Sequence, residues 1–293
     1  MNLNFVVKKT FQISESDFNS YCDIFNLIFK KKLSNNDLKK KYLSGKDGYA
    51  IHSLLYNDEE ICAGFTLIPY NYIFNNKKII IALGCDAFVK KEYRCNEMIL
   101  YKLYKNLTKT QLSEDIKFVI SIPNSRASKY WEIIAKWKKI GNLNLKIFPL
   151  NLFKMKFLWK RIFFFLNYFS SDNNNFELYI DTNKSFLETR FYGYEKYKNS
   201  YFKIYREGKY SVLYLFCIDS ISSNEKINLF RYLFKNYDID FFSVCTNYDF
   251  KPFIKVPKYL IDRDINVMIN KEFEPNNYKF SKWALSLTNF DNR

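Results

Sequence analysis

The chain has 293 residues, of which 48% are hydrophobic and 20% aromatic, so it can bury one large core or two modest ones. One histidine and six cysteines without a CxxC spacing supply too few soft ligands for a zinc site. Because His52 is the only histidine, a Ser-His-Asp mechanism is also excluded unless His52 serves by itself. The formal net charge of +16 would attract phosphates, nucleic acids or anionic lipids, but the lysines are spread through both halves, and we interpret the excess as compositional bias rather than dedicated nucleic-acid binding.

Targeting signals are not evident in the sequence. Residues 1–10 contain no apolar run typical of a signal peptide. The most apolar segment, 157–169, is interrupted by Lys160 and Arg161 and is too short to span a bilayer. We therefore predict a cytoplasmic protein whose cysteines are reduced, buried thiols.

The first half of the chain shows alternating helical and extended patterns. The predicted elements are, in chain order, helices that begin near Ser14 and Ser34, antiparallel strands at 49–55, 60–68 and 78–89, a helix at 96–107, a strand at 118–122, a helix after Asn124 and a strand at 143–149. This order predicts an α/β fold around a mixed sheet.

The second half repeats this style after an aromatic and basic connector. We expect residues 151–175 to form that connector, buried between two domains, with a membrane-surface helix as the alternative. Beyond it we predict strands at 176–180, 201–205 and 210–218, a helix capped by Ser222 with Glu225, and strands at 240–245 and 264–269. The predicted domains are thus 1–150 and 176–293, the second being a smaller α/β unit.

Residues 84–100 carry the most informative pattern. A strand runs into a short loop that contains Arg94, and the loop then opens a helix. Free backbone N–H groups and the positive end of a helix dipole are a common binding site for a pyrophosphate.

Two motifs in the first half of the chain resemble those of the GNAT acetyltransferases. Val89, Glu92, Tyr93 and Arg94 are similar to the start of that superfamily's cofactor motif, V-x-P-E-Y-R-G-x-G-x-G/A. Pro123-Asn124, followed by the Trp-Lys-Lys-Ile-Gly of residues 137–141, resembles the second motif, in which an asparagine opens a helix that ends in an aromatic-glycine turn. The motifs stand in the expected order and about the expected distance apart.

The resemblance implies a GNAT-like fold, with a mixed, mainly antiparallel sheet flanked by helices and a second, smaller GNAT-like α/β unit. It also implies acetyl-CoA or another acyl-CoA as co-substrate and no metal. The residues that would bind the cofactor are Phe88, Val89, Arg94, Cys95, Asn96, Glu97 and Asn124.

A narrower resemblance concerns the acceptor. Ala63-Gly64-Phe65 through Pro69, the pair Arg190-Phe191 and the ending 283–291 look like GNAT proteins encoded with surface-polysaccharide genes, although Asn289 replaces an aspartate of their ending. This implies a nucleotide-linked or polysaccharide-precursor sugar as acceptor.

One departure from the cofactor motif concerns its glycines. Cys95, Glu97 and Ile99 occupy their positions, so side chains crowd the phosphate cradle and the Glu97 carboxylate opposes a phosphate. Lys90, Lys91 and Arg94 are the candidates to compensate. The departure keeps open a catalytically inactive GNAT-like scaffold as an alternative.

The chemistry implied is direct attack of an acceptor amine or hydroxyl on the thioester. It needs a base, a donor for the oxyanion and an acid for the thiolate. We expect a backbone N–H near Phe88 or Val89 as the oxyanion donor and Asp86 as the base or acceptor-orienting group. Tyr130 is the candidate acid, although strict alignment places Trp131 there. His52 is a second candidate base, with a buried, hydrogen-bonded histidine as the alternative.

A second enzyme class also fits the pattern. A Fem-like aminoacyltransferase has tandem GNAT units and takes its acyl group from charged tRNA, and it would explain both the charge of +16 and the missing glycines. A DNA-binding protein fits less well, because no helix-turn-helix or zinc-finger pattern is present.

Overall fold

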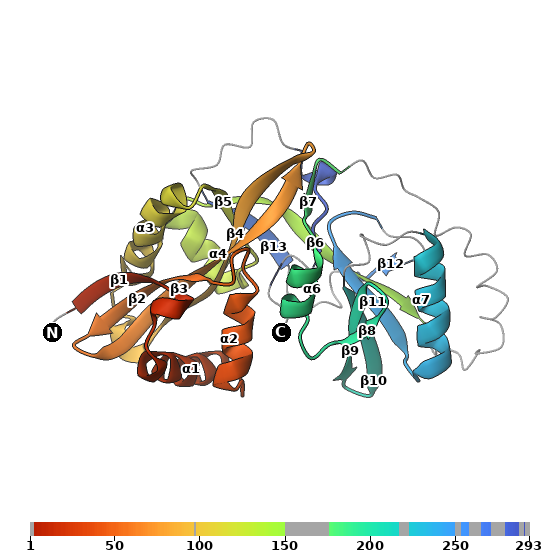
Figure 1. Cartoon of the computed structure of the whole chain (residues 1–293), viewed down its shortest axis with the longest axis horizontal. Coiled ribbons are helices and arrows are strands. Elements are labelled where there is room, and N and C mark those ends of the chain that lie inside the picture. Colours follow the sequence, from red (N-terminus) through yellow and green to blue (C-terminus); the bar gives the residue numbers. More distant parts are fainter. Residues whose placement is uncertain are drawn as a thin grey trace. The chain divides into compact units, whose positions relative to one another are not determined.

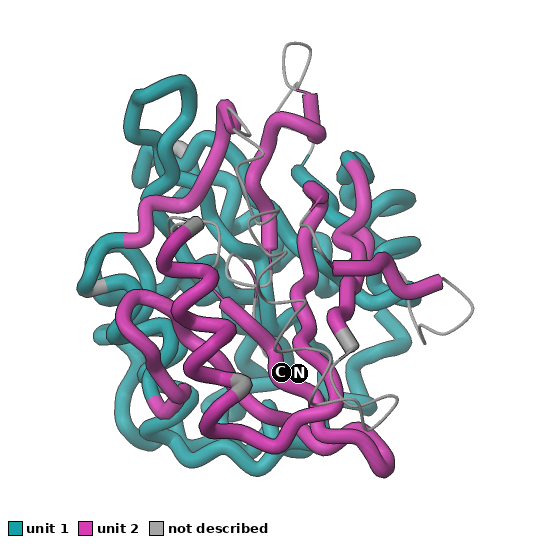
Figure 2. Tube along the Cα trace, turned by 90° about the vertical axis from the view of Figure 1, so that its right-hand side faces the viewer, with its two compact units in different colours: residues 1–140, 183–192, 267–276 teal, residues 141–182, 193–266, 277–293 magenta. Residues whose placement is uncertain are grey.

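The computed structural model describes residues 3–96, 98–149, 176–216, 223–249, 253–257, 265–270, 279–286 and 290 (Figure 1). The chain divides into two compact units (Figure 2): unit 1 contains residues 1–140, 183–192 and 267–276, and unit 2 contains residues 141–182, 193–266 and 277–293. The connector 151–175, Glu97, Ser222 and Asn289 lie outside the described residues.

Unit 1 is built on a mixed sheet. Its strands are β1 (Leu3–Lys9), β2 (Ile51–Asn57), β3 (Glu60–Phe74), β4 (Lys77–Val89), β5 (Ile116–Ser121) and the end of β13 (Ile265–Ile269), in that spatial order. Neighbours pair antiparallel except β4 and β5, which are parallel. Asn75 and Asn76, with φ of 46° and 62°, form the tight turn between β3 and β4, a conformation that asparagine tolerates.

Helices cover both faces of this sheet. They are α1 (Glu15–Phe29), α2 (Asn35–Leu43), α3 (Met98–Ser113), α4 (Ser125–Ile133) and the short α6 (Lys184–Arg190). The side chains of Ser14 and Ser34 accept N–H bonds from Asp17 and Asp37, so the predicted caps of α1 and α2 are confirmed. Figure 1 shows α1 and α2 on one face and α3 and α4 on the other.

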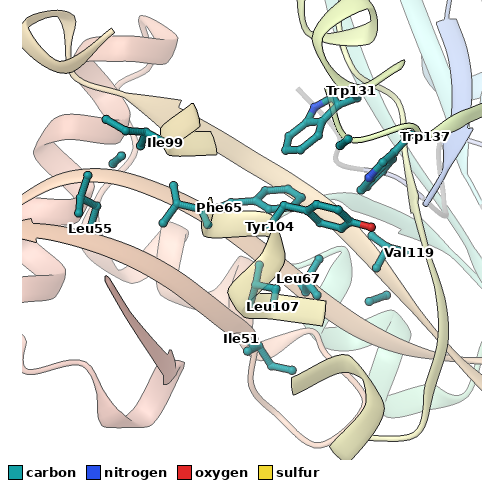
Figure 3. Packing of buried hydrophobic residues seen from close by; sticks show 14 of the residues in the cluster. Ile51, Leu55, Phe65, Leu67, Ile99, Tyr104, Leu107, Val119, Trp131 and Trp137 are labelled. Atoms are coloured by element: carbon teal, nitrogen blue, oxygen red, sulfur yellow. The ribbon is translucent and has the colours of Figure 1, made fainter. Parts of the chain in front are cut away.

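The core on the α3–α4 face combines aliphatic side chains with a group of aromatic rings (Figure 3). The Trp131 ring lies 5.0 Å from that of Phe65 and 5.2 Å from that of Trp137, and Tyr104 meets Trp137 edge-on at 5.6 Å. Such pairs contribute about 0.5–1.5 kcal/mol each beyond their burial. Because side chains alternate along a strand, Phe65 and Leu67 enter this core while Thr66 faces α1.

Three sequence predictions need correction. Strand β1 was missed, because its polar and apolar residues do not alternate cleanly. Strand β6 (Lys138–Pro149) starts earlier than predicted, so Gly141 lies within a strand, and Lys136 with φ of 58° makes the left-handed turn after α4. The end of strand β13, which was expected in the second unit, pairs with β5 of unit 1, where Met268 and Ile269 are buried.

Unit 2 has its own mixed sheet and core. The sheet order is β6, β11 (Phe241–Thr246), β10 (Tyr210–Phe216), β9 (Ser200–Glu207) and β8 (Glu195–Tyr197), with β12 (Ile254–Lys255) also on β6. The parallel pair β10–β11 is joined through α7 (Ser223–Asn236), whose Phe230 packs 5.1 Å from Phe242. Strand β7 (Leu178–Ile180) and the 3-10 helix Phe280–Lys282 belong to the same unit.

In the part of the chain that the structure describes, no helix is both long enough and apolar enough to cross a membrane.

Candidate functional site

Strand β4 contains a bulge near its carboxyl end. Its register with β3 pairs Cys85 with Thr66 and Phe88 with Gly64, so Asp86 and Ala87 together oppose the single residue Phe65. Asp86 has φ of 53°, in the left-handed region that side chains disfavour. A bulge of this kind re-aims the backbone and the side chain of the strand that carries it.

The same part of β4 has an open edge. The parallel pairing with β5 ends at Leu83 and Ile120, whereas β4 continues to Val89. Within the described residues, no strand pairs with residues 84–89 on that side. This edge can therefore form backbone hydrogen bonds with an extended ligand.

The loop that follows β4 is tied to the strand end by side chains. The Nε of Arg94 donates to the carbonyl of Val89 at 2.9 Å, and Lys90 pairs with Glu60. Asn96 caps α3, because its Oδ1 accepts from the N–H of Met98 at 3.1 Å. Arg94, Cys95 and Asn96 are exposed, so the Arg94 guanidinium and the start of α3 are open to an anion.

Phe88 and Val89 have buried and half-buried side chains, respectively. The Phe88 ring is 2% exposed and meets the ring of Tyr21 at 5.3 Å. It covers Gly64 so closely that a Cβ there would lie 2.8 Å from it. These two side chains thus serve the core, and only their backbone groups are available for a ligand.

Helix α4 begins just after β5, at the edge of the sheet where β4 also ends. Asn124 is its N-cap, and Oδ1 accepts from the N–H of Ala127 at 2.9 Å, which confirms the prediction that this residue opens a helix. Tyr130 is half-buried and lies edge-on to Trp131 at 5.4 Å. Trp131 is buried in the aromatic core.

Asp86 lies on the other face of the sheet, in a buried polar cluster. Lys41 Nζ is 2.8 Å from both carboxylate oxygens, and the exposed fractions of the two side chains are 11% and 6%. The Tyr42 hydroxyl donates to Oδ2 at 2.8 Å, and the Cys85 thiol lies 3.6 Å from the same oxygen. Because a buried charge is costly without partners, these donors make the carboxylate tolerable.

From Tyr42 a chain of buried hydrogen bonds leads through α1 to strands β3 and β2. The Tyr42 and Tyr21 hydroxyls are 2.9 Å apart, and Tyr21 lies 3.2 Å from Thr66 Oγ1. Thr66 Oγ1 is 3.0 Å from Nδ1 of His52, and Nε2 of His52 is 3.0 Å from Thr10 Oγ1.

The ionisable members of this chain are neutral. Burial, assisted by the charge of Lys41, lowers the pKa of His52 to about 3. Burial and then the Asp86 charge raise the pKa of both Tyr21 and Tyr42. His52 is fully buried and hydrogen-bonded at both ring nitrogens, in agreement with the alternative expected for it rather than with a role as base.

The structure groups most of the predicted site residues at one edge of unit 1. Phe88 and Val89 end β4, Arg94 to Asn96 open α3, and Asn124 and Tyr130 lie on α4. Sequence reasoning missed Lys41, Tyr42 and Tyr21, because no local pattern links α1 and α2 to the β4 bulge. The one signal in the sequence was that Tyr21 and Tyr42 each fall on the apolar face of a predicted helix.

Comparisons with known proteins support the fold. No family model and no curated protein matches the sequence. A GCN5-related N-acetyltransferase from Anabaena variabilis matches with a TM-score of 0.58 and 11% identity, over 91% of this chain and 72% of its own. A conserved protein of unknown function from Enterococcus faecalis, described as a probable N-acyltransferase, matches with a TM-score of 0.57, 9% identity and coverage of 91% and 72%.

A third structure agrees with these two. A GCN5-related N-acetyltransferase from Kribbella flavida matches with a TM-score of 0.56 and 10% identity, over 92% of this chain and 70% of its own. At such low identities the likeness concerns the fold. The predicted GNAT-like α/β fold, with a mixed, mainly antiparallel sheet and flanking helices, is confirmed.

Proposed function

We propose that this chain is a GNAT-type acyltransferase that moves an acetyl or other acyl group from acyl-CoA to an amino or hydroxyl group of a small acceptor. The observation that carries the proposal is the open edge of β4 beyond Leu83, which ends beside Arg94 and the start of α3 within a GNAT-like fold. A fold alone does not define an activity, so the argument depends on how these parts match the ligand.

The proposed acyl-CoA site has two parts. The amide-bearing arm of the cofactor would pair with the free backbone groups of residues 84–89, as an added strand does. The pyrophosphate would lie at the start of α3, near Arg94, Cys95 and Asn96, where it would replace the Asn96 side chain as the cap. Asn124, which begins α4 at the same edge of the sheet, would complete the site.

In the proposed reaction the acceptor nitrogen or oxygen attacks the thioester carbonyl. The new C–N or C–O bond forms and the C–S bond breaks. The acceptor would release its proton to solvent, and the thiolate would take one from Tyr130, which solvent would then reprotonate. A backbone N–H near Phe88 or Val89 would stabilise the oxyanion. Asp86 would orient the acceptor, and Tyr130 would supply a proton to the leaving thiolate.

Asp86 suits orientation better than strong base catalysis, because Lys41 and Tyr42 already compensate its charge. Within the described residues, Oδ1 accepts only from Lys41, which leaves it room for one further donor. As acceptor we propose a nucleotide-linked or polysaccharide-precursor sugar, a choice that depends only on the sequence resemblance of residues such as Gly64 and Arg190-Phe191.

Calorimetric titration with acetyl-CoA tests the cofactor site. We expect binding that weakens at least several-fold in Arg94→Ala, because a phosphate contact is lost. Lys109→Ala is the matched control, since it removes the same charge from an exposed position near the other end of α3 and is expected to bind like the wild type.

Failure of the folded wild type to bind acetyl-CoA or longer acyl-CoAs would overturn the proposal. Salt-dependent binding of charged tRNA in the same protein would then support the Fem-like alternative, which the net charge of +16 favours.

A further inference from the structure

We infer that Lys41 and Tyr42 of α2 are positioning residues for acyl transfer, because they hold the β4 bulge in shape through the carboxylate of Asp86. This inference depends on the proposed function. It concerns residues that touch neither the cofactor motif nor the helix starts at the edge of the sheet.

The bulge needs an outside restraint. Asp86 is a non-glycine residue at φ of 53°, a conformation that persists only where the surroundings over-determine it. Its backbone directly precedes the N–H groups near Phe88 and Val89 that the proposed reaction uses. A change at Asp86 would therefore re-aim those donors.

The restraint is the buried contact with α2. Lys41 reaches both carboxylate oxygens at 2.8 Å, and Tyr42 reaches Oδ2 at 2.8 Å. The two residues are adjacent at the end of α2, so a single helix end determines where the carboxylate lies. At exposed fractions of 11% and 6%, the Lys41–Asp86 pair is shielded from water and from salt.

The hydrogen-bond chain behind Tyr42 has one direction. An ionised carboxylate only accepts, so Tyr42 donates to Asp86, and the contact at 2.9 Å then requires Tyr21 to donate to Tyr42. By the same reasoning Thr66 donates to Tyr21, and His52 donates through Nδ1–H to Thr66. Thr10 then donates to Nε2 of His52, with the Ala50 carbonyl at 3.2 Å as its alternative acceptor.

This chain orients groups and does not carry protons. Passing a proton would require a charged His52 or an ionised tyrosine in a fully buried chain, and burial disfavours each of these states. The chain connects α1, α2, β2 and β3 to the bulge, so its function is to maintain the alignment of Tyr42 toward Asp86.

Four variants test the inference: Lys41→Met, Tyr42→Phe, Asp86→Asn and the double variant Lys41→Met/Asp86→Asn. Lys40→Met is the matched control, because it removes the same charge from the preceding position of α2. The measured quantities are the affinity for acetyl-CoA and the rate of thiol release from acetyl-CoA, with water or a nucleotide-linked amino sugar as acceptor.

We expect Lys41→Met and Asp86→Asn each to lower kcat on the order of 10–100-fold, with a smaller loss of acetyl-CoA affinity because the helix-start part of the proposed site is not disturbed. The double variant should be no slower than the slower single variant, because both remove one restraint. Tyr42→Phe, which keeps the ring, should show a smaller loss in the same direction. Circular dichroism and acetyl-CoA binding establish that each variant is folded.

A kcat in Lys41→Met equal to that of the wild type would overturn the inference while leaving the proposed function intact. A loss of kcat in the double variant equal to the product of the two single-variant losses would do the same. An acidic limb of the kcat–pH profile that moves to higher pH in Lys41→Met would identify Asp86 as a base and overturn it as well. A folded wild type that neither binds nor cleaves any acyl-CoA would overturn both proposals together.

Discussion

His52 predicts a specific pH dependence of stability, which is unusually easy to assign because it is the only histidine in the chain. An ordinary histidine has a pKa of 6.5, whereas burial and the nearby Lys41 lower the pKa of His52 to about 3 in the folded protein and keep its ring neutral. The folded pKa is depressed, so the unfolded chain binds more protons between these two values. The contribution of the neutral His52 ring to the free energy of unfolding is therefore present above pH 6.5, and it is lost as the pH falls below that value.

The magnitude follows from the distance below the unfolded pKa. At pH 5 the ring is about one and a half pH units below that value, and each unit corresponds to about 1.36 kcal/mol. The free energy of unfolding should thus decrease by about 2 kcal/mol between pH 7 and pH 5. A variant that lacks His52 keeps every carboxylate of the wild type, so the difference in slope between the two proteins reports on His52 alone.

Urea unfolding at pH 7, 6 and 5 measures this slope, and His52→Gln is the control. The variant should be less stable than the wild type at pH 7, by about 1–3 kcal/mol for the buried hydrogen bonds that it disturbs. Its stability should stay nearly constant from pH 7 to pH 5. Equal slopes in the two proteins, or imidazole NMR signals in the folded wild type with a midpoint near pH 6.5, would refute the reasoning.

Further predictions concern local packing and capping. Gly64→Ala should destabilise the protein by about 1–3 kcal/mol in chemical denaturation, because its Cβ would lie 2.8 Å from the Phe88 ring. Phe88→Leu should relieve part of this cost. A double variant whose loss of stability equals the sum of the two single losses would contradict the contact. Asn124→Ala should cost about 1 kcal/mol through loss of the α4 cap, as Ser14→Ala should for α1. Asn124→Asp should keep the cap but weaken acetyl-CoA binding in calorimetry, because it adds a negative charge to the proposed site. Unchanged binding would argue against a role of Asn124 in that site.

Much of unit 1 could be predicted from local sequence. The caps at Ser14, Ser34 and Asn124, and the turn at Asn75-Asn76, depend on residues a few positions apart, so their physics is contained in the local chain. The residues at the end of β4 and the start of α3 were predicted for the same reason. They follow one another in sequence, and strand-to-helix loops bring such residues together.

The parts that sequence reasoning missed depend on long-range packing. The pairing of β13 with β5 joins residues whose separation along the chain gives no periodic signal. The burial of Met268 and Ile269 and the hydrogen bonds between Asn270 and Val119 favour it. The position of Gly141 within β6 likewise depends on the ring of Phe280, which fills the space where a Cβ would be.

The Asp86 cluster shows the same limit at the candidate site. The sequence by itself determined that Asp86 stands near the end of a strand and that Tyr21 and Tyr42 lie on the apolar faces of their helices. Only the tertiary structure brought Lys41 within 2.8 Å of Asp86 and linked Tyr42 to His52 through two hydroxyl groups. The physical reason is that a buried charge selects its partners by proximity in the folded core, and that proximity is set by how helices pack on a sheet rather than by spacing along the chain.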